Sequence, residues 1–497
     1  MSLSSALSTA QSIFSNTGLQ SAALSKNIAN ASNPDYARRV GILTIDATGA
    51  QKLAIERTYD NGLVKQVMQS TSESSAQDVL QQKLEGMKSL LGGNDYETAP
   101  STYMKTLRDN LQAYATKPNE STLAATVVSS AMDVSSSLNS ISSEIQAMRG
   151  TIDREITDII EKLNGLLKQF GDVNGAIKAG TALGHDVNNE MDMRDRYLKE
   201  ISEIVGVRSF TRDNNDMALY TTDGTMLFDL DARKIMFNPQ PAYDAMTTGN
   251  PIIIDGAKMT AGENGNTTSR GKLQALLQIR DEVIPRYQSQ LDETARGLVE
   301  MFAQEDMTGG VADALPGLFT WSGYAAGDTI PVTGTVVPGL AAAIKVNDSL
   351  IKSKGGDPTL LRDGGYDVDG LGVASTDYLG NVNHEAGYST LLDGYVAGFE
   401  AQRDFDPSTF LDAKTTIGQF ATGSVGWLEQ LISESAAAKD NKQAQLTRVA
   451  EALSNTTGVS LDEEMALMLE LEQSYKASSK LVSTVDEMIQ ALLAAVK

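Results

Sequence analysis

The sequence predicts a mainly α-helical protein with β-rich insertions, in which a long helical rod is closed by a coiled coil of the two chain ends. Three observations support this fold class. Apolar residues keep a helical repeat from Val127 to Phe170, which corresponds to about 65 Å at about 1.5 Å per residue. Both ends of the chain carry heptad stripes. Between residues 206 and 265 the pattern changes to short alternating runs with Asp-Gly turns, which are typical of strands.

The first stripe lies at the N-terminus, on a predicted helix that has no charged side chain up to Ser25. Its positions alternate in steps of four and three residues, and they are Leu3, Leu7, Ala10, Phe14, Thr17, Ser21, Leu24 and Ile28. Such a stripe follows one side of a helix and is too apolar to face water alone. We therefore predict that this helix packs against a partner helix.

A matching stripe lies at the C-terminus, and its last stretch from Met488 to Val496 is again uncharged. The stripe consists of Leu461, Met468, Leu471, Tyr475, Ser478, Val482, Val485, Ile489, Leu492 and Val496, with Glu464 as a polar intruder. The two end helices could cover each other's stripes, but their outer faces would remain neutral. A neutral outer face favours packing against further copies of the molecule. A plain intrachain coiled coil is the alternative, because periodicity does not separate the two.

A turn-forming segment follows the first helix, with the sequence ANASNPDYARR from Ala29 to Arg39. Asn33 before Pro34 is pushed out of the helical region, so the helix is expected to end here. Alternation of apolar residues from Val40 to Ile45 then predicts a short strand or extended arm.

The predicted elements divide the chain into consecutive segments. The two ends are 1–60, with the first helix and the arm, and 458–497, with the last helix. The rod is expected in three pieces: 61–205, with helices near 64–91 and 102–115; 266–307, with a helix from about 271 to 304; and 408–457. Between these pieces lie a small β-rich unit at 206–265 and a Gly/Asp-rich, loop- and β-rich outer inserted domain at 308–407. Ser460 is the candidate N-cap of the last helix.

The composition excludes several kinds of chemistry. With no cysteine and two distant histidines, the sequence offers no metal-ligand set, thiol nucleophile or catalytic constellation, and we expect no metal, no cofactor and no enzyme activity. A net charge of −23 argues against nucleic acid or an anionic membrane as the main partner. The N-terminus lacks the basic start of a secretory signal, so a cleavable signal peptide is not expected.

Two stretches of the sequence resemble known proteins. Ala29, Asn30, Pro34, Tyr36 and Arg38 match a motif near the N-terminus of bacterial flagellar axial proteins of the rod, hook and junction. Asp35 stands where the motif has Gly, and we expect it to tolerate positive φ there. The C-terminal stretch from Gly458 to Leu493, with LDEE and STVDEM, resembles the hook-associated protein 1 family of hook–filament junction proteins.

The resemblance implies a structural subunit of the bacterial flagellum that is needed for filament assembly. Proteins of this family are expected outside the cell, in a ring of about eleven subunits that self-associate through paired terminal helices. The implied partners are further copies of the chain, the hook protein, the second junction protein (hook-associated protein 3) and a flagellar export chaperone. Another axial protein, such as hook protein or the second junction protein, is the alternative. A secreted enzyme displayed on the flagellum, with its site in 308–407, is a further one.

Overall fold

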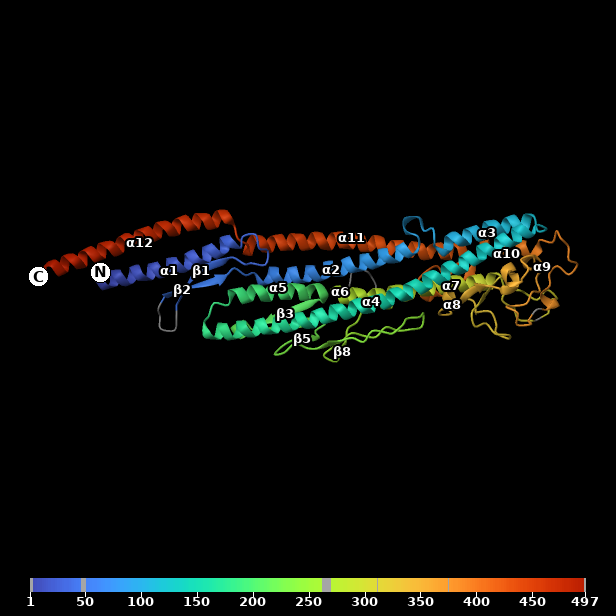
Figure 1. Ribbon diagram of the computed structural model, residues 1–497, viewed down its shortest axis with the longest axis horizontal. Helices are drawn as coiled ribbons and strands as arrows, with labels where there is room; N and C mark the ends of the chain where they lie inside the picture. Colours follow the sequence, from blue (N-terminus) through green and yellow to red (C-terminus); the bar gives the residue numbers. More distant parts are fainter. Residues whose placement is uncertain (1–2, 46–50, 262–269, 311, 374, 496–497) are drawn as a thin grey trace.

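The computed structural model describes residues 3–45, 51–261, 270–310, 312–373 and 375–495 of the chain. The molecule is elongated, and its long helices run nearly parallel to its longest axis (Figure 1). The N- and C-terminal helices lie together at one end, and the segment around α9 and α10 lies at the other. The predicted mainly helical, rod-like fold with small β units is confirmed.

Long helices form the rod. They are α2 (Asn61–Leu90), α3 (Pro100–Thr116), α4 (Ser121–Leu183), α5 (Asn188–Ile204) and α11 (Ile417–Thr457). The longest, α4, has 63 residues and extends beyond the apolar repeat at both ends. It ends where Gly184 takes a left-handed conformation (φ 71°) and its N–H donates to the carbonyl groups of Gly180 and Thr181. Hydrophobic periodicity therefore located this helix but underestimated its length.

The helix expected between 271 and 304 is interrupted. It consists of α6 (Lys272–Gln278), a π-helical turn (Ile279–Val283) and α7 (Ile284–Met301). Pro285 has no N–H to donate, and its ring would clash with the carbonyl of the residue four positions earlier. A π-turn widens the backbone at this point and lets the helix continue.

Two three-stranded antiparallel sheets form the β-rich unit that the sequence predicted. The first has the order β3 (Val207–Thr211), β4 (Met217–Thr221), β5 (Met226–Phe228), and the second has the order β6 (Ile235–Met236), β7 (Ile253–Ile254), β8 (Ala257–Lys258). The turn between β7 and β8 is the expected Asp-Gly turn, with Asp255 at φ 49° and Gly256 at φ 84°.

The segment between 308 and 407 contains short elements and one longer helix. They are β9 (Phe319–Trp321), α8 (Leu340–Ala343), β10 (Ile344–Val346), α9 (Leu360–Asp363), α10 (Thr390–Glu400) and β11 (Arg403–Asp404), and β11 pairs with β12 (Lys414–Thr415). Phe302, at the end of α7, contacts the rings of Phe319, Tyr395 and Phe399 at centroid distances of 5.4, 5.0 and 6.1 Å. This segment therefore shares its core with the end of the rod.

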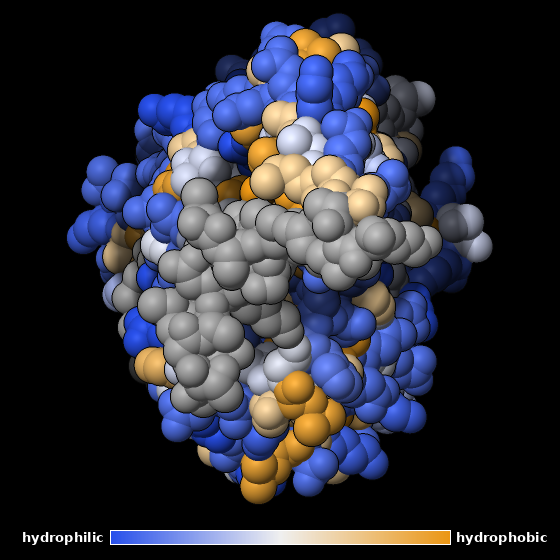
Figure 2. Space-filling view, turned by 90° about the vertical axis from the view of Figure 1, so that its left-hand side faces the viewer, coloured by the Kyte–Doolittle hydropathy of each residue, from blue (hydrophilic) through white to orange (hydrophobic). Residues whose placement is uncertain are grey.

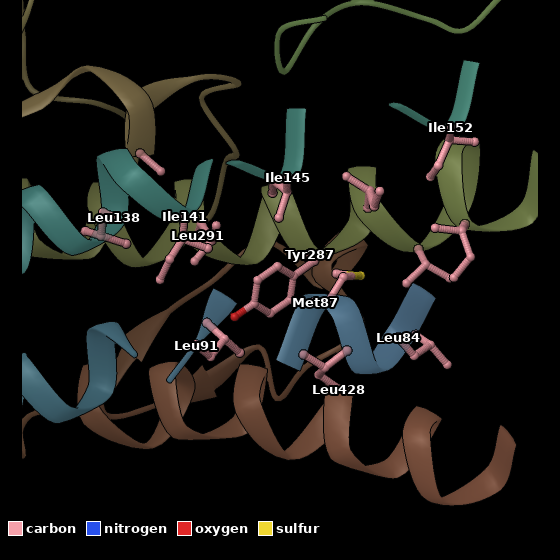
Figure 3. Packing of buried hydrophobic residues seen from close by; sticks show 14 of the residues in the cluster. Leu84, Met87, Leu91, Leu138, Ile141, Ile145, Ile152, Tyr287, Leu291 and Leu428 are labelled. Atoms are coloured by element: carbon pink, nitrogen blue, oxygen red, sulfur yellow. The ribbon is translucent and has the colours of Figure 1, made fainter. Parts of the chain in front are cut away.

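Single 3₁₀ turns complete the described elements: η1 (Gly93–Asp95), η2 (Asp213–Asn215), η4 (Asp348–Leu350), η5 (Lys352–Lys354), η6 (Thr376–Tyr378) and η7 (Pro407–Thr409). The core of the rod is formed where α2, α4, α7 and α11 meet. Tyr287 of α7 lies at the centre of this packing, with Met87 of α2, Ile145 of α4 and Leu428 of α11 around it (Figure 3). None of the helices, over the residues that the structure describes, is long and apolar enough to cross a membrane.

One buried carboxylate joins this core to the outer segment. Asp292 of α7 is 1% exposed and accepts hydrogen bonds from the N–H groups of Gly339 and Ala341 at 2.9 and 2.8 Å, where α8 begins. Gln288 Nε2 donates a third bond at 3.0 Å. Burial nevertheless dominates, and it raises the pKa of Asp292 to about 6.

This pKa predicts a pH-dependent stability. A folded-state pKa above the unfolded value of about 3.9 means that the folded protein binds more protons between those values, so stability falls as pH rises from about 4 to about 6. Asp292→Asn lacks this titration. The quantity to follow is the difference in the free energy of unfolding between the unmodified chain and Asp292→Asn. We expect this difference to fall by about 3 kcal/mol between pH 4 and pH 6, because the pKa shift is about two units and one unit corresponds to about 1.4 kcal/mol. Urea unfolding at pH 4, 5, 6 and 7 measures it, and a pH-independent difference would contradict the assignment.

Candidate assembly site at the terminal helices

The two ends of the chain form a helix pair at one end of the molecule. α1 (Leu3–Ala29) packs along α12 (Leu461–Ala495), and a hairpin of β1 (Arg39–Ile45) and β2 (Gln51–Arg57) lies beside α1 (Figure 1). The ring of Phe14 contacts that of Tyr475 edge to face, with centroids 5.1 Å apart. The prediction that the N- and C-terminal helices pair is confirmed, and within one chain they cover each other only in part.

The predicted stripe residues differ in burial. Leu24 and Val485 are buried, as are Ala10, Thr17 and Ser478, whereas Phe14, Ile28, Leu471 and Val482 are half-buried. Tyr475 is 53% and Ile489 is 37% exposed, despite their stripe positions. The side chains of Leu3, Leu7 and Leu492, and Val496 as a whole, lie outside the described part of the structure. Their role in subunit packing stays a prediction.

The helix pair exposes several large apolar side chains. Among the described residues they are Leu19, Leu461, Met465, Leu467, Leu469, Leu481 and Met488, of which Met465 and Leu469 are 60% and 62% exposed. Seen from the end that carries the termini, hydrophobic residues interrupt the hydrophilic surface (Figure 2). Several exposed apolar side chains on one pair of helices are typical of a protein interaction site.

Asn27 is the centre of a polar cluster where the first helix ends. Its side chain is fully buried and uses both ends of its amide. Oδ1 accepts hydrogen bonds from Tyr36 Oη and from the Arg39 N–H, each at 2.9 Å. Nδ2 donates to the Arg39 carbonyl at 2.9 Å and to Glu464 Oε2 at 2.8 Å. One side chain thus holds together α1, the start of β1 and the start of α12.

Arg38 completes the connection to the C-terminal helices. Its Nε donates to Glu464 Oε1 at 2.6 Å, and Nη1 lies 3.1 Å from Glu463 Oε2. Its N–H donates to the carbonyl of Thr457, the last residue of α11, at 2.8 Å. Arg38 therefore lies against the joint between α11 and α12. We call Asn27, Tyr36, Arg38, Arg39 and Glu464 the motif hub.

The motif hub is also tied to the rod. Arg39 is buried and pairs with Asp192 of α5, which also lies 3.2 Å from Arg57 Nη1. Arg57 in turn pairs with Asp195 at 2.7 Å. Burial raises the pKa of Tyr36 to about 12, so its phenol stays protonated and donates to Asn27. Because α5 belongs to the rod, these contacts fix the helix pair to it.

The five residues of the predicted family motif differ in position and in the contacts they make. Ala29 is the last residue of α1, Asn30 Nδ2 donates to the Lys26 carbonyl at 2.9 Å, and Pro34 is exposed in the turn. Tyr36 and Arg38 enter the motif hub. Asp35 is not among the described non-glycine residues with positive φ, so that expectation was wrong. Its N–H instead bonds Asn33 Oδ1 at 3.1 Å, which closes an Asx-turn without left-handed backbone.

Sequence reasoning missed Asn27, Arg39 and Glu464 as hub members. The available signal was Glu464 itself, an isolated carboxylate in an otherwise apolar stripe, which requires a buried partner. Over the described residues, no group of three or more His, Asp or Glu side chains is placed to hold a metal ion. What this end of the molecule offers is packing surface and a rigid joint.

Comparisons with known proteins agree with this arrangement. A family model described as "Flagellar hook-associated protein FlgK helical domain" matches residues 84–317, which include the rod. A second, "Flagellar basal body rod FlgEFG protein C-terminal", matches residues 452–495, which include α12. The first model covers nearly half of the chain, and relatives named flagellar hook-associated protein 1 cover 95% of it. The chain belongs to the FlgK family of flagellar hook-associated proteins. Its predicted recognition as a hook-associated protein 1 is thereby confirmed.

Full-length relatives support the FlgK assignment. The chain is 24% identical over 519 residues to flagellar hook-associated protein 1 of Bacillus subtilis, with 95% of each chain covered. It is 22% identical over 538 residues to that of Salmonella typhimurium, with 95% of this chain and 96% of the relative covered. The solved structure of the flagellar hook junction protein FlgK from Burkholderia pseudomallei shares the fold, with a TM-score of 0.57, 12% identity and coverage of 78% of this chain and 99% of that one.

Membership in the FlgK family confirms several predictions. The family consists of structural, non-enzymatic proteins of the flagellar hook–filament junction, which lies outside the cell. The predicted function and localisation are thus confirmed at this level, and the chain is not an enzyme. Flagellar axial proteins follow as the class of partner.

Proposed function

We propose that this chain forms the ring that joins hook to filament, and that its subunits associate through the exposed apolar side of the α1–α12 helix pair. The observation that carries this proposal is that α1 and α12 pair with each other and still expose Met465, Leu469, Leu481 and Met488. A helix meant for bulk water would carry charged residues at such positions. Neighbouring copies of the chain would bury them.

The ring is expected to contain about eleven copies, with hook protein on one side and the second junction protein, hook-associated protein 3, on the other. A flagellar export chaperone is the expected partner before assembly, and neither nucleic acid nor a membrane is needed as a partner. The stripe residues of α1 and α12 would then serve two purposes. The buried ones hold the pair together, and the half-exposed ones, such as Tyr475 and Ile489, reach neighbouring subunits.

The motif hub gives this assembly its geometry. A helix pair that could swing freely against the rod would lose orientational entropy each time a subunit joined the ring. Arg38 and Glu464 hold the start of α12 against α1, and Arg39 and Asp192 hold the turn against α5. We therefore assign Tyr36 and Arg38 a positioning role, with Ala29, Asn30 and Pro34 shaping the turn that brings them there.

The segment divisions predicted from the sequence fit this proposal. Segments 1–60 and 458–497 supply the helix pair, and 61–205, 266–307 and 408–457 supply the rod. The β-rich unit 206–265 and the outer segment 308–407 lie against the rod and its far end.

Deletion and complementation test the proposed function. Cells that lack the chain should build hooks without filaments, and the unmodified chain should restore the filaments. Leu481→Glu with Met488→Glu should fail to restore them, because charges replace side chains that are 57% and 52% exposed in the single chain but buried in the ring. Ser479→Glu, at an exposed polar position of the same helix, is the matched control. Restoration by the double variant would show that this surface does not mediate assembly.

A further inference from the structure

A cleft lies in the rod between α2, α5 and β3. Its volume is about 490 Å³, and Met68, Leu198 and Phe210 contribute apolar walls. Phe210 is 56% exposed and is held edge to face against Tyr220, with ring centroids 5.6 Å apart. An exposed aromatic ring fixed by a second ring is pre-organised for contact with a partner.

The rim of this cleft is basic. Lys65, Arg208 and Arg270 line it, and within the described ranges none of the three side chains forms a salt bridge. The chain as a whole has a net charge of −23, so three unpaired cations around one cleft are unusual. Ser72 Oγ in the cleft wall is buried and has no hydrogen-bond partner among the described residues. The cleft therefore fits an apolar segment that carries negative charge.

The same chain exposes a surface of this kind at the start of α12. On the side away from α1, Met465 and Leu469 are 60% and 62% exposed, and Asp462 and Glu470 lie beside them and are also exposed. Residues at 462, 465–466 and 469–470 follow one face of a helix. We call Asp462, Met465, Leu469 and Glu470 the acidic face.

We propose that the cleft between α2, α5 and β3 receives the acidic face of a second copy of this chain. Charge complementarity supports this occupant, because the basic rim meets carboxylates and the apolar walls meet Met465 and Leu469.

This contact is heterologous, because the cleft and the acidic face are different surfaces of one chain. Heterologous contacts generate rings when the rotation between neighbours closes. The inference rests on the proposed ring, and it adds to that proposal a specific lateral contact between neighbouring subunits. One side of this contact is the start of α12, and the other is on the rod, since the cleft residues belong to α2, α5 and β3.

Charge reversal tests the pairing. Lys65→Glu with Arg208→Glu should reduce the number of filaments per cell about tenfold, because like charges would then oppose each other across the contact. Asp462→Lys with Glu470→Lys should cause a similar loss. The chain that carries all four changes should recover filaments, because attraction is restored with the signs exchanged. Lys168→Glu, on an exposed position of α4, is the matched control and should leave filament number unchanged.

Cross-linking reports the contact directly, because the chain has no cysteine of its own. With Ser209→Cys in the cleft and Ala466→Cys on the acidic face, oxidised flagella should yield disulfide-linked multimers of the chain. Lys168→Cys with Ala466→Cys should yield none. A cross-linked product that contains a different protein, or no multimers from flagella that assemble normally, would overturn the inference. Failure of the unmodified chain to support filaments would instead refute the proposed function.

Discussion

Arg38→Met is expected to destabilise the terminal helix pair by about 3 to 5 kcal/mol, which is the typical cost of leaving one member of a buried ion pair without its partner. The side chain of Glu464 is only 1% exposed, and Arg38 is its cationic partner at 2.6 Å. Without Arg38, Asn27 Nδ2 is the remaining donor to this carboxylate among the described contacts. Hydrogen exchange of the α12 amides in the full chain measures the loss, and it should be confined to α1, α12 and the hairpin.

A double variant separates charge burial from packing. Arg38→Met with Glu464→Met removes both charges and should regain most of the lost stability, because apolar residues often replace a buried ion pair at little cost. Glu463→Gln is the matched control, because Glu463 pairs with the same arginine but its side chain is 63% exposed. Its effect should stay below about 1 kcal/mol. Equal losses in the single and double variants would contradict the proposed buried pair.

The double variant also distinguishes stability from geometry. If the motif hub sets the direction of α12 relative to the rod, the double variant should be stable and still form fewer filaments than the unmodified chain. Full recovery of both properties would mean that the pair contributes stability alone.

Much of the fold could be predicted from local patterns. The heptad stripes predicted α1 and α12, and the helical repeat from Val127 predicted α4. Both predictions were possible because burial of one helix face makes apolar residues recur every three or four positions. The change of period after Gly206 and the Asp-Gly turns predicted the small sheets. Two local features were not predicted: the π-turn before Pro285 and the helix α10 in a Gly-rich segment.

The motif hub shows where sequence reasoning ends. Arg38 and Glu464 are 426 positions apart, so no local pattern pairs them. Glu464 was noticed only as an interruption of an apolar stripe, although a single buried carboxylate is itself a sign of a distant cation. Tyr36 and Arg38 could be named through the family motif, whereas Asn27 precedes it and its fully buried amide has no pattern of its own. The hub became visible only when α1, α5 and α12 were placed together.

The burial of the stripe residues also could not be predicted from the sequence alone. The spacing of Tyr475 and Ile489 is that of core positions, yet both remain exposed, because within the described part of the chain the helix that packs along α12 is α1. Periodicity reports that a face needs a partner and does not report whether the partner belongs to the same molecule. The structure therefore shows the intrachain pairing of α1 with α12, and the remaining face of α12 is exposed in the single chain.

Asp153→Ala is expected to cost about 3 to 5 kcal/mol in the middle of the rod, where a second buried ion pair joins α4 to the π-turn. Asp153 and Arg280 have side chains that are 1% and 0% exposed, and Oδ1 of Asp153 lies 2.7 Å from Arg280 Nη1. Its Oδ2 accepts hydrogen bonds from the Gln240 N–H at 2.8 Å and from Tyr243 Oη at 2.9 Å. Burial alone would lower the pKa of Arg280, but the hydrogen bonds that its guanidinium donates to the Asp281 and Asp153 carboxylates raise it.

The loss of stability in Asp153→Ala should be largest in the segment between β6 and β7. This segment has no helix, and besides Asp153 it is held by Arg149, which donates to the carbonyl groups of Asp244 and Thr247 at 3.2 and 2.8 Å. Limited proteolysis of Asp153→Ala should therefore cut between residues 237 and 252 before the rod helices. Asp158→Ala, an exposed carboxylate on the same helix, is the matched control and should leave the cleavage pattern unchanged.

Two readouts decide whether the ion pair itself matters. Urea unfolding followed by Trp fluorescence reports the whole rod, because Trp427 stacks on Tyr287 in its core. If Asp153→Ala unfolds at the same urea concentration as Asp158→Ala, the pair contributes no net stability, and Arg280 must be satisfied by Asp281 and the Asn250 carbonyl alone. If unfolding and cleavage both shift, the buried pair fixes the β-rich unit to the rod. The proposed docking cleft would then depend on it as well, because β3 belongs to that unit.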